Sequence, residues 1–583
     1  MPRTERAANH YTPALLLGRQ TAHAVYIVAI WLLVTPTRSS AAETPAPAGA
    51  LGGPGWYDVT RYGAKGDGIA DDAAAIAAVV RQMPPSGGIL YLPPGNYGIR
   101  NTIVLRRGVS LRGAGMGVSR VIQANGANLS SLVTYPASSF VTVSDLTLDG
   151  NKAANTTRID GLLNFDNSSD VVVRNCEFMN AVGHATVGVA LRFGGENKRI
   201  LIDGNYVHDS GTAGTTPADA IYVGGSSVRV VNNLVIRASD TGIVYEAVGA
   251  SSEAPADHAV IANNVIRNTP QGIAVDTAIA GTFGATTTVV GNTIEGVNAV
   301  NGASIFVFKG PRGKSQVAVS VVANVIRNSV DGHGIFLDSV SEVAVSGNVL
   351  SGVSSQRAKH GITVLRSSHV SIVGNTIHGS GGNGVSLQGV TVVTLTGNVI
   401  GDANLAGVGG VGIDVRDVAG KRSEGVVVVG NNVSGTKHNY GLQVADGATN
   451  LLAFGNSLTG VVRPINRATT GLTAFDSNMA PSGLISDVTG GPRASSGLST
   501  SSEWRPGQLA DGGVATTTVR VGTAAPGDGV VCSHDQLGAR LLLLTCHVES
   551  PGVIRTVLLN RSGGPVAVPS GTLHVLVLPH RAP

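Results

Sequence analysis

The stretch "NNVIRNTPQGIAVD", Asn263 to Asp276, holds one complete unit of a repeat that runs through the middle of the chain. An Asn after a turn residue opens a short apolar stretch, and a Gly-Ile turn opens a second one. The first part returns as "GNTIEG" around Asn292, "ANVIRN" around Asn324 and "GNTIHG" around Asn375. The second part returns as "HGIFLD", "HGITVL" and "VGIDVR". Repetition on this scale indicates an array of stacked structural units.

The alternation of apolar and polar residues inside each unit predicts short β-strands, and the spacing of three and four residues typical of helices is rare. One unit cannot close a core, but stacked units bury a continuous apolar interior. Successive Asn residues lie 23 to 33 residues apart, so the turns absorb the insertions. We therefore predict an all-β fold, most simply a right-handed parallel β-helix. The recurring Asn, from Asn175 to Asn456, is predicted to form an internal ladder of side-chain amides.

The stretch "YGAKGDGIADDAAAIAAVV", Tyr62 to Val80, places acidic residues before a run of alanines. A carboxylate at the start of a helix accepts hydrogen bonds from free backbone amides and favours the positive helix end. A solenoid also needs a cap over its open end. We therefore expect an N-terminal capping helix that begins after Asp71 or Asp72.

Composition supports many short strands joined by tight turns. The chain of 583 residues contains 79 glycines, with 13% charged and 4% aromatic residues. Its formal charge of +4 is spread thinly, without a dense basic run, which excludes nucleic acid as an expected partner.

The first 42 residues are predicted to be a signal peptide. Arg3, Arg6 and Arg19 precede an apolar run over residues 24–34, which is too short to span a bilayer, and small residues follow near Ala42. We expect an exported protein, secreted or at the cell surface, without membrane contact after cleavage. An uncleaved membrane anchor is the alternative.

Domain boundaries follow from the end of the repeat. We predict a linker over 43–56, the β-helix over 57–479 and a Ser/Gly/Pro-rich linker over 480–507. Residues 508–583 alternate with turn signals and predict a small β-sandwich. Cys532 and Cys546 are placed to pair in an oxidising compartment, whereas Cys176 is expected to be buried and alone.

Three motifs resemble the pectate-lyase-like superfamily: "YDVTRYGAKGDGIADDAAAIAAVV", "GGILYLPPGNYGIRNTIVLRRGVSLRGAG" and "VSDLTLDGN". In that group they form the N-terminal cap and first coils shared by polygalacturonase-like enzymes, uronate lyases and epimerases, and phage tailspikes. The resemblance spans Tyr57 to Asn456 and implies a right-handed parallel β-helix that acts on or binds a polysaccharide. The C-terminal part resembles jelly-roll modules, which implies carbohydrate contact or a homotrimer.

In a β-helix, equivalent positions of successive coils stack ~4.8 Å apart, so columns of side chains can be read from the repeat. The outward position four residues after the repeated Gly runs Gly224, Glu246, Asp276, Phe308, Asp338, Leu365, Gln388 and Arg416. The middle coils concentrate charge on this face, with two histidines at its edge. The predicted catalytic residues are Asp276, Lys309, His333, Asp338, His360 and Arg366.

Several reactions fit these residues. Glu246 and Asp276, one coil and ~5 Å apart, resemble a retaining pair of a glycoside hydrolase; Asp276 and Asp338, ~10 Å apart, resemble an inverting pair. Alternatively, Glu246 and Asp276 hold Ca²⁺ against a uronate carboxylate, while Lys309 or Arg366 removes the neighbouring proton. That reaction is β-elimination, or epimerisation if the proton returns to the other face.

We favour an exported lyase-type enzyme acting on a uronate-containing polysaccharide. "DGHGIFLDS" resembles a Gly-His-Gly segment of polygalacturonases, but the acidic signatures expected on the preceding coils are absent, which weakens hydrolysis. The alternatives are a non-catalytic glycan-binding or tailspike-like surface protein, and a charged column that is only a solvated face.

Overall fold

The computed structural model describes residues 55–578 apart from 184–187, 213, 247–257, 277–285, 310–317, 355–357, 419, 446, 462, 468–471, 477, 481–482, 486–498, 523, 527, 537–541, 561 and 563. The predicted signal peptide and almost all of the linker over 43–56 lie outside the described residues. Among the described residues, no helix combines the length and the apolar character needed to cross a membrane.

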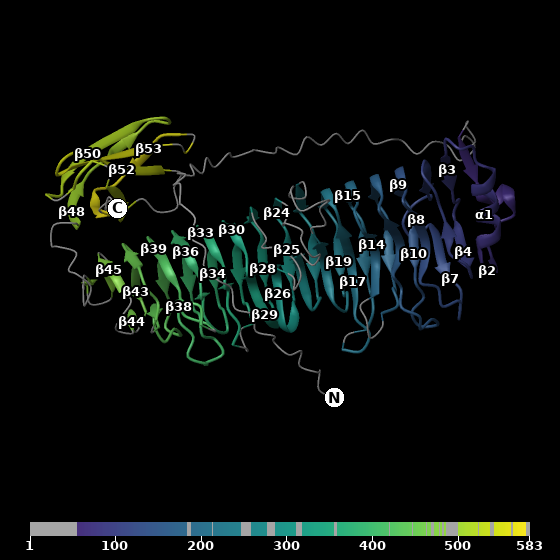
Figure 1. Cartoon of the computed structure of the whole chain (residues 1–583), viewed down its shortest axis with the longest axis horizontal. Helices are drawn as coiled ribbons and strands as arrows, with labels where there is room; N and C mark the ends of the chain where they lie inside the picture. Colours follow the sequence, from purple (N-terminus) through teal and green to yellow (C-terminus); the bar gives the residue numbers. More distant parts are fainter. Residues whose placement is uncertain are drawn as a thin grey trace, which may run out of the picture. The chain divides into compact units, whose positions relative to one another are not determined.

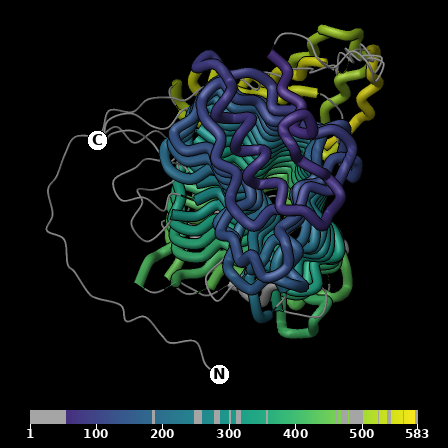
Figure 2. The backbone as a smooth tube through the Cα atoms, turned by 90° about the vertical axis from the view of Figure 1, so that its right-hand side faces the viewer, coloured from purple at the N-terminus to yellow at the C-terminus, as the bar shows by residue number. Residues whose placement is uncertain are grey.

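Most of the chain forms a parallel β-solenoid, as predicted (Figure 1). Sheet 1 has 16 strands, from β1 (Trp56–Asp58) to β45 (Leu472–Asp476). Sheet 2 begins with β2 (Asp67–Asp71) and continues in parallel pairs to β46 (Asn478–Ala480). Viewed at right angles, the coils lie one behind another, which is the stacking that the repeat predicts (Figure 2).

Sheet 3 has 14 strands and presents the charged column. Its strands are β5 (Ile103–Val104), β8 (Ser131–Pro136), β11 (Gly161–Asp166), β14 (Gly188–Gly194), β17 (Ala218–Gly224), β20 (Thr241–Glu246), β23 (Gln271–Asp276), β26 (Asn298–Phe308), β29 (Asp331–Asp338), β32 (Ile362–Leu365), β35 (Val385–Gln388), β38 (Ile413–Arg416), β41 (Leu442–Val444) and β44 (Ile465–Arg467). Side chains alternate between the interior and the outside, because successive Cβ atoms of a strand point to opposite faces. In β20, Ile243 and Tyr245 are fully buried, while Val244 is half-buried on the outer side.

The predicted Asn ladder is confirmed. From Asn233 onward, each Asn of the ladder accepts hydrogen bonds from the backbone N–H and side-chain amide of the Asn one coil earlier, as Asn324 Oδ1 does from Asn292 at 3.0 and 2.9 Å. The ladder runs through Asn205, Asn233, Asn264, Asn292, Asn324, Asn348, Asn375, Asn398, Asn431, Asn456 and Asn478. These bonds satisfy polar groups that stacking removes from water.

The predicted start of the ladder is wrong by one residue. Asn175 has φ 51° and occupies the turn position that Gly204 occupies one coil later. Buried Cys176 takes the ladder position, and its N–H donates to Asn205 Oδ1 at 3.0 Å. Cysteine fits there because it is small and apolar, and the prediction that Cys176 is buried and unpaired is correct.

The predicted N-terminal helix is present as α1 (Ala73–Gln82) and lies at the first end of the solenoid (Figure 1). Asp71 Oδ1 accepts from the N–H of Ala73 at 3.2 Å, which is the helix-start bond that the sequence suggests. Asp72 instead accepts from the N–H groups of Lys65 and Gly66 at 2.6 and 3.1 Å. Its carboxylate therefore holds the preceding loop, and the capping role of α1 stays a prediction.

The C-terminal residues form antiparallel sheets. One contains β48 (Ser499–Trp504), β55 (Gly571–Leu578) and β51 (Gly529–His534); another contains β50 (Val514–Arg520), β53 (Val553–Asn560) and β52 (Leu542–Ser550). Strand β48 lies inside the range predicted as a linker, so this module begins earlier than expected. A disulfide joins Cys532 to Cys546, as predicted. Its assignment as a sandwich, and any trimer formed through it, stay predictions.

Candidate functional site

The outer face of sheet 3, here called the site face, carries the predicted column in the predicted register. Glu246 lies opposite Asp276, Asp276 opposite Phe308, and Phe308 opposite Asp338. The repeat allows this prediction because a strand slip by one residue would turn the apolar side chains outward. A second outward column lies two residues earlier in each strand, and it was not read from the sequence.

The N-terminal part of the site face contains an acidic cluster of Asn164, Asp166, Arg192, Glu246 and Asp276. Arg192 Nη1 donates to Asn164 Oδ1 at 2.9 Å and to Asp166 Oδ1 at 3.0 Å. The side chains of Arg192 and Asp166 are 31% and 42% exposed, so the pair meets solvent. A Cβ at the position of Gly194 would overlap with the ends of both side chains in this arrangement, so a larger residue there would move the pair.

Glu246 and Asp276 form the predicted pair of neighbouring acids. Burial, together with the negative charge of Asp276, raises the pKa of Glu246 to about 7, and the positive charge of Arg192 opposes this shift. Only 9% of Glu246 is exposed. A carboxyl group that titrates near neutral pH can both accept and donate a proton, as general acid–base catalysis requires.

Two coils of the site face carry stacked phenylalanines, here called the aromatic platform: Phe306 and Phe308 of β26 and Phe336 of β29. The ring centroids of Phe306 lie 4.2 Å from Phe308 and 5.0 Å from Phe336, with interplanar angles of 22° and 16°. All three side chains are half-buried. The platform separates the acidic cluster from the histidines.

The structure brings His333 and His360 together, with ring centroids 5.3 Å apart. His333 Nδ1 lies 2.9 Å from Thr363 Oγ1, and His360 Nδ1 accepts from the N–H of Asn383 at 2.8 Å. Burial lowers the pKa of His333 to about 3 and that of His360 to about 4, with neighbouring positive charges as further causes. Both rings are therefore neutral near pH 7 and act as hydrogen-bonding groups.

Asp338 and Arg366 form an ion pair on the next coils. Arg366 Nε and Nη2 donate to the two carboxylate oxygens of Asp338 at 3.0 and 2.5 Å. Lys309 is exposed, and its backbone N–H donates to the carbonyl oxygen of Asp338 at 3.1 Å. A guanidinium bound at both donors to a carboxylate is a poor base, and the catalytic roles of these three residues stay predictions.

A polar network near the C-terminal end of the site face was missed as a site. Asp414 has no exposed side chain, and Oδ2 accepts from Arg416 Nε, Asn383 Nδ2 and Ser386 Oγ at 2.6, 3.1 and 3.3 Å. Burial raises the pKa of Asp414, and its hydrogen bonds to Arg416 lower it. The unread column two residues after the repeated Gly contains Ser386 and Asp414, and would have revealed this network.

Arg192, which the sequence suggests only as a residue that could line a groove, and Asn164 were left out of the predicted site for another reason. Their strands, "GLLNFD" and "GVALRFG", lack the Gly-Ile pair used to align the columns. A pairing of these strands with "AIYVG", which contains Tyr222, would have placed Arg192 beside Tyr222, as the structure does.

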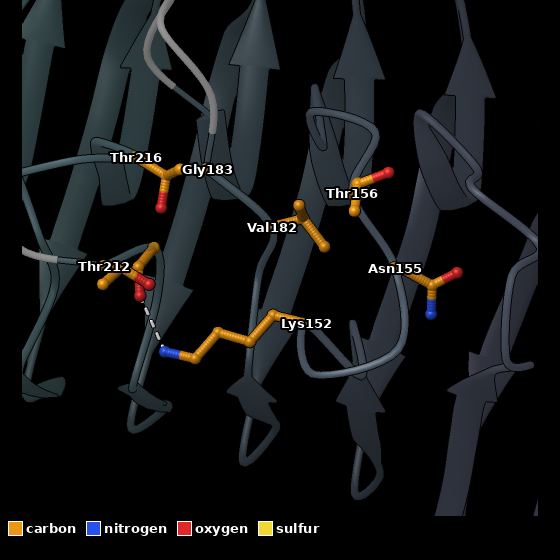
Figure 3. Close-up of a pocket in the computed structure, with 8 residues that line it drawn as sticks. Lys152, Asn155, Thr156, Val182, Gly183, Thr212 and Thr216 are labelled. Atoms are coloured by element: carbon orange, nitrogen blue, oxygen red, sulfur yellow. Dashed lines mark hydrogen bonds between the residues drawn. The ribbon is translucent and has the colours of Figure 1, made fainter.

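A separate pocket of about 230 Å³ lies at the turns beside the solenoid (Figure 3). It is lined by Lys152, Asn155, Thr156, Val182, Gly183, Gly211, Thr212 and Thr216. Lys152 Nζ donates to the carbonyl oxygens of Asp209 and Gly211 at 2.5 and 2.7 Å. Burial lowers the pKa of Lys152, and the two carbonyls occupy two of its three donors, so in this pocket Lys152 holds the neighbouring turn.

Comparisons with known proteins agree with this class of fold. Residues 56–304 match the family model "Rhamnogalacturonase A/epimerase, pectate lyase-like", and residues 312–479 match "Right handed beta helix region". Gene product 12 of bacteriophage phi29 superposes with a TM-score of 0.53 at 16% identity, covering 72% of this chain and 58% of that one. The chain is a right-handed parallel β-helix protein with a pectate-lyase-like segment, as the sequence motifs predicted.

More specific similarity is confined to a short segment. Mannuronan C5-epimerase AlgE6 of Azotobacter vinelandii is 37% identical over 121 residues, which cover 18% of this chain and 14% of the epimerase. Alginate lyase 7 of the same organism is 32% identical over 118 residues, covering 18% of this chain and 14% of the lyase. The chain therefore matches a small part of the length of these relatives.

Proposed function

We propose that this protein is an exported enzyme that modifies a uronate-containing polysaccharide by removing the proton next to the uronate carboxylate. The acidic cluster on the site face is its active site. The observation that carries this proposal is Glu246, a buried acid with a pKa of about 7, one coil from Asp276 and on the same face as the half-buried Arg192.

The chemistry requires a base and a group that stabilises the resulting negative charge. Glu246 accepts the proton from C5, and the electron pair of the broken C–H bond moves into the carboxyl group. Arg192 binds that carboxyl group, because a guanidinium matches a carboxylate in charge and geometry. Tyr222 lies opposite Arg192 in the neighbouring strand, and we assign it the role of proton donor.

Two outcomes share this first step. If a proton returns to C5 from the opposite side, the product is the epimer. If the C4–O bond breaks and the leaving oxygen takes the proton, the product has an unsaturated end. Support for this pair of reactions comes from the relatives, which are a mannuronan C5-epimerase and an alginate lyase. The acidic cluster also lies within the pectate-lyase-like segment.

A calcium ion held by Glu246 and Asp276 is a second form of the same proposal. Carboxylate oxygens are suitable ligands, but Ca²⁺ takes six to eight oxygens. Within the described part of the chain, no group of three or more His, Cys, Asp or Glu residues is arranged to hold a metal. The substrate carboxylate and water would therefore supply most of the ligands, and loss of activity in chelator tests this form.

The test of function compares Glu246→Gln with wild type on mannuronan. We expect kcat to fall by about 10²–10⁴-fold, the range for a lost acid–base group. In wild type, kcat/KM should rise with pH through about 7, because Glu246 must be deprotonated to accept the proton. Glu342→Gln is the matched control, since Glu342 is exposed on β30 (Ser341–Ser346) of sheet 1.

Unchanged turnover in Glu246→Gln would contradict the assignment of the base. Binding of mannuronan by wild type without any turnover would favour the alternative function, a non-catalytic glycan-binding protein.

A further inference from the structure

The aromatic platform occupies a defined place next to the acidic cluster. Phe308 lies opposite Asp276, and Phe306 lies opposite Ala274 of the same strand. The platform therefore begins one coil after Asp276 and two coils after Glu246. Two strand spacings correspond to about 10 Å.

The rise of one coil is comparable to the length of one pyranose residue in an extended glycan. A glycan that lies along the solenoid axis with one uronate at Glu246 therefore places a ring two residues further on over Phe306 and Phe336. The axial C–H groups of a pyranose form an apolar face. The three rings, stacked on one another and half-buried, together present an apolar surface that can meet it.

The surroundings of the platform fit an anionic chain. Lys309 is exposed directly after Phe308, where it can meet a carboxylate of the chain. Arg366, one strand beyond Phe336, already donates to both carboxylate oxygens of Asp338. The apolar face of a sugar ring would meet the platform, and a carboxylate of the chain would meet Lys309. A neutral chain would use only the first of these contacts.

We propose that Phe306, Phe308 and Phe336 form a distal sugar-binding subsite for a uronate chain, two residues from the uronate held at Glu246. This inference rests on the proposed function for the direction of the chain and for the position of the reacting residue. It predicts that affinity depends on glycan length, because a short oligomer at Glu246 does not reach the platform.

The test uses the full chain and the double variant Phe306→Ala/Phe336→Ala, with dissociation constants for mannuronan dimer and hexamer measured by calorimetry. Both side chains point outward, so we expect the variant to fold, which circular dichroism checks. Phe140→Ala is the matched control, because Phe140 is 60% exposed on β9 (Ser139–Ser144) of sheet 1.

We expect the double variant to weaken hexamer binding about tenfold, as loss of an aromatic contact worth ~1.4 kcal/mol does, and to leave dimer binding unchanged. An unchanged hexamer affinity, or an equal loss for both lengths, would overturn the subsite. Platform-dependent binding without turnover would support the subsite and overturn only the proposed reaction. A wild-type protein that binds neither oligomer would overturn the subsite as well.

Discussion

At the residue scale, the buried carboxyl of Glu246 makes the free energy of unfolding depend on pH. Its pKa is about 7 in the folded protein and ~4.3 in an unfolded chain, so the folded state holds the proton more tightly. The stabilisation is complete below the unfolded pKa and is lost as pH rises through about 7.

Glu246→Gln removes this dependence, because glutamine is neutral at every pH. The variant should therefore be more stable relative to wild type at about pH 8 than at about pH 4, which means that its relative free energy of unfolding is larger at about pH 8. Urea denaturation at the two pH values measures the difference, with Glu342→Gln as the control. Parallel pH profiles for Glu246→Gln and wild type would show that Glu246 is not desolvated in the folded protein.

Substitutions in the ion pair of Asp338 with Arg366 test which part of the site face is the active site. The two candidates are the acidic cluster and the later coils that carry Asp338 and Arg366. If the acidic cluster is the active site, Asp338→Asn and Arg366→Gln should each change kcat by less than about threefold. Their stability cost should be below ~1 kcal/mol, since Arg366 is exposed and solvent screens the pair. Steady-state kinetics on mannuronan measure kcat for both variants. A loss of kcat comparable to that of Glu246→Gln would mean that the active site lies on the coils of Asp338 and Arg366.

At the scale of elements, the Asn ladder ties each coil to the next. Asn324 donates to the carbonyl oxygen of Val289 at 3.0 Å and to Asn348 Oδ1 at 2.9 Å, and it accepts from Asn292. Asn324→Ala leaves these buried groups without partners, at ~1–3 kcal/mol each. We expect a total loss of about 3 kcal/mol, measured by urea denaturation.

The matched control for the ladder is Asn96→Ala, because Asn96 is exposed in β4 (Gly95–Ile99). Its cost should stay within about 0.5 kcal/mol. Equal losses at Asn96 and Asn324 would mean that the ladder contributes no specific stability.

The sequence allowed the elements to be predicted better than the site. The column from Glu246 to Asp338 and the ladder from Asn205 onward follow from the repeat, since stacking forces equivalent positions into register. The prediction that Asn175 starts the ladder was wrong, because Cys176 occupies the ladder position and lacks the side-chain amide that marks it in the other coils. Arg192 was not placed in the predicted site, because its coil lacks the Gly-Ile pair used to align the columns. In addition, no local motif shows which column will contain a charged partner.

At the scale of the whole molecule, the two largest apolar clusters belong to different parts of the chain. One follows the solenoid interior from Val59 to Ile465, and the other lies within the C-terminal sheets from Trp504 to Val577. The disulfide between Cys532 and Cys546, with a sequence separation of 14, belongs to the second part. Closing a loop of this size contributes ~3 kcal/mol.

Reduction of this disulfide should therefore lower the unfolding temperature of the C-terminal sheets and leave that of the solenoid unchanged. Differential scanning calorimetry with and without a thiol reductant measures both, and Cys532→Ser/Cys546→Ser should give the same shift without reductant. Cys176 is buried and should not react in the folded protein. A thermogram in which the solenoid transition moves as far as that of the C-terminal sheets would contradict this prediction.

The most direct test of the account is proton exchange at C5 of mannuronan incubated with the protein in heavy water at about pH 8, where Glu246 is deprotonated. Exchange precedes both epimerisation and elimination, so it does not depend on which product forms. We predict deuterium at C5, with epimerised or unsaturated residues in the same spectrum, and loss of this signal in Glu246→Gln. A wild-type protein that binds mannuronan and incorporates no deuterium, with no unsaturated ends, would contradict the claim that the site face removes this proton.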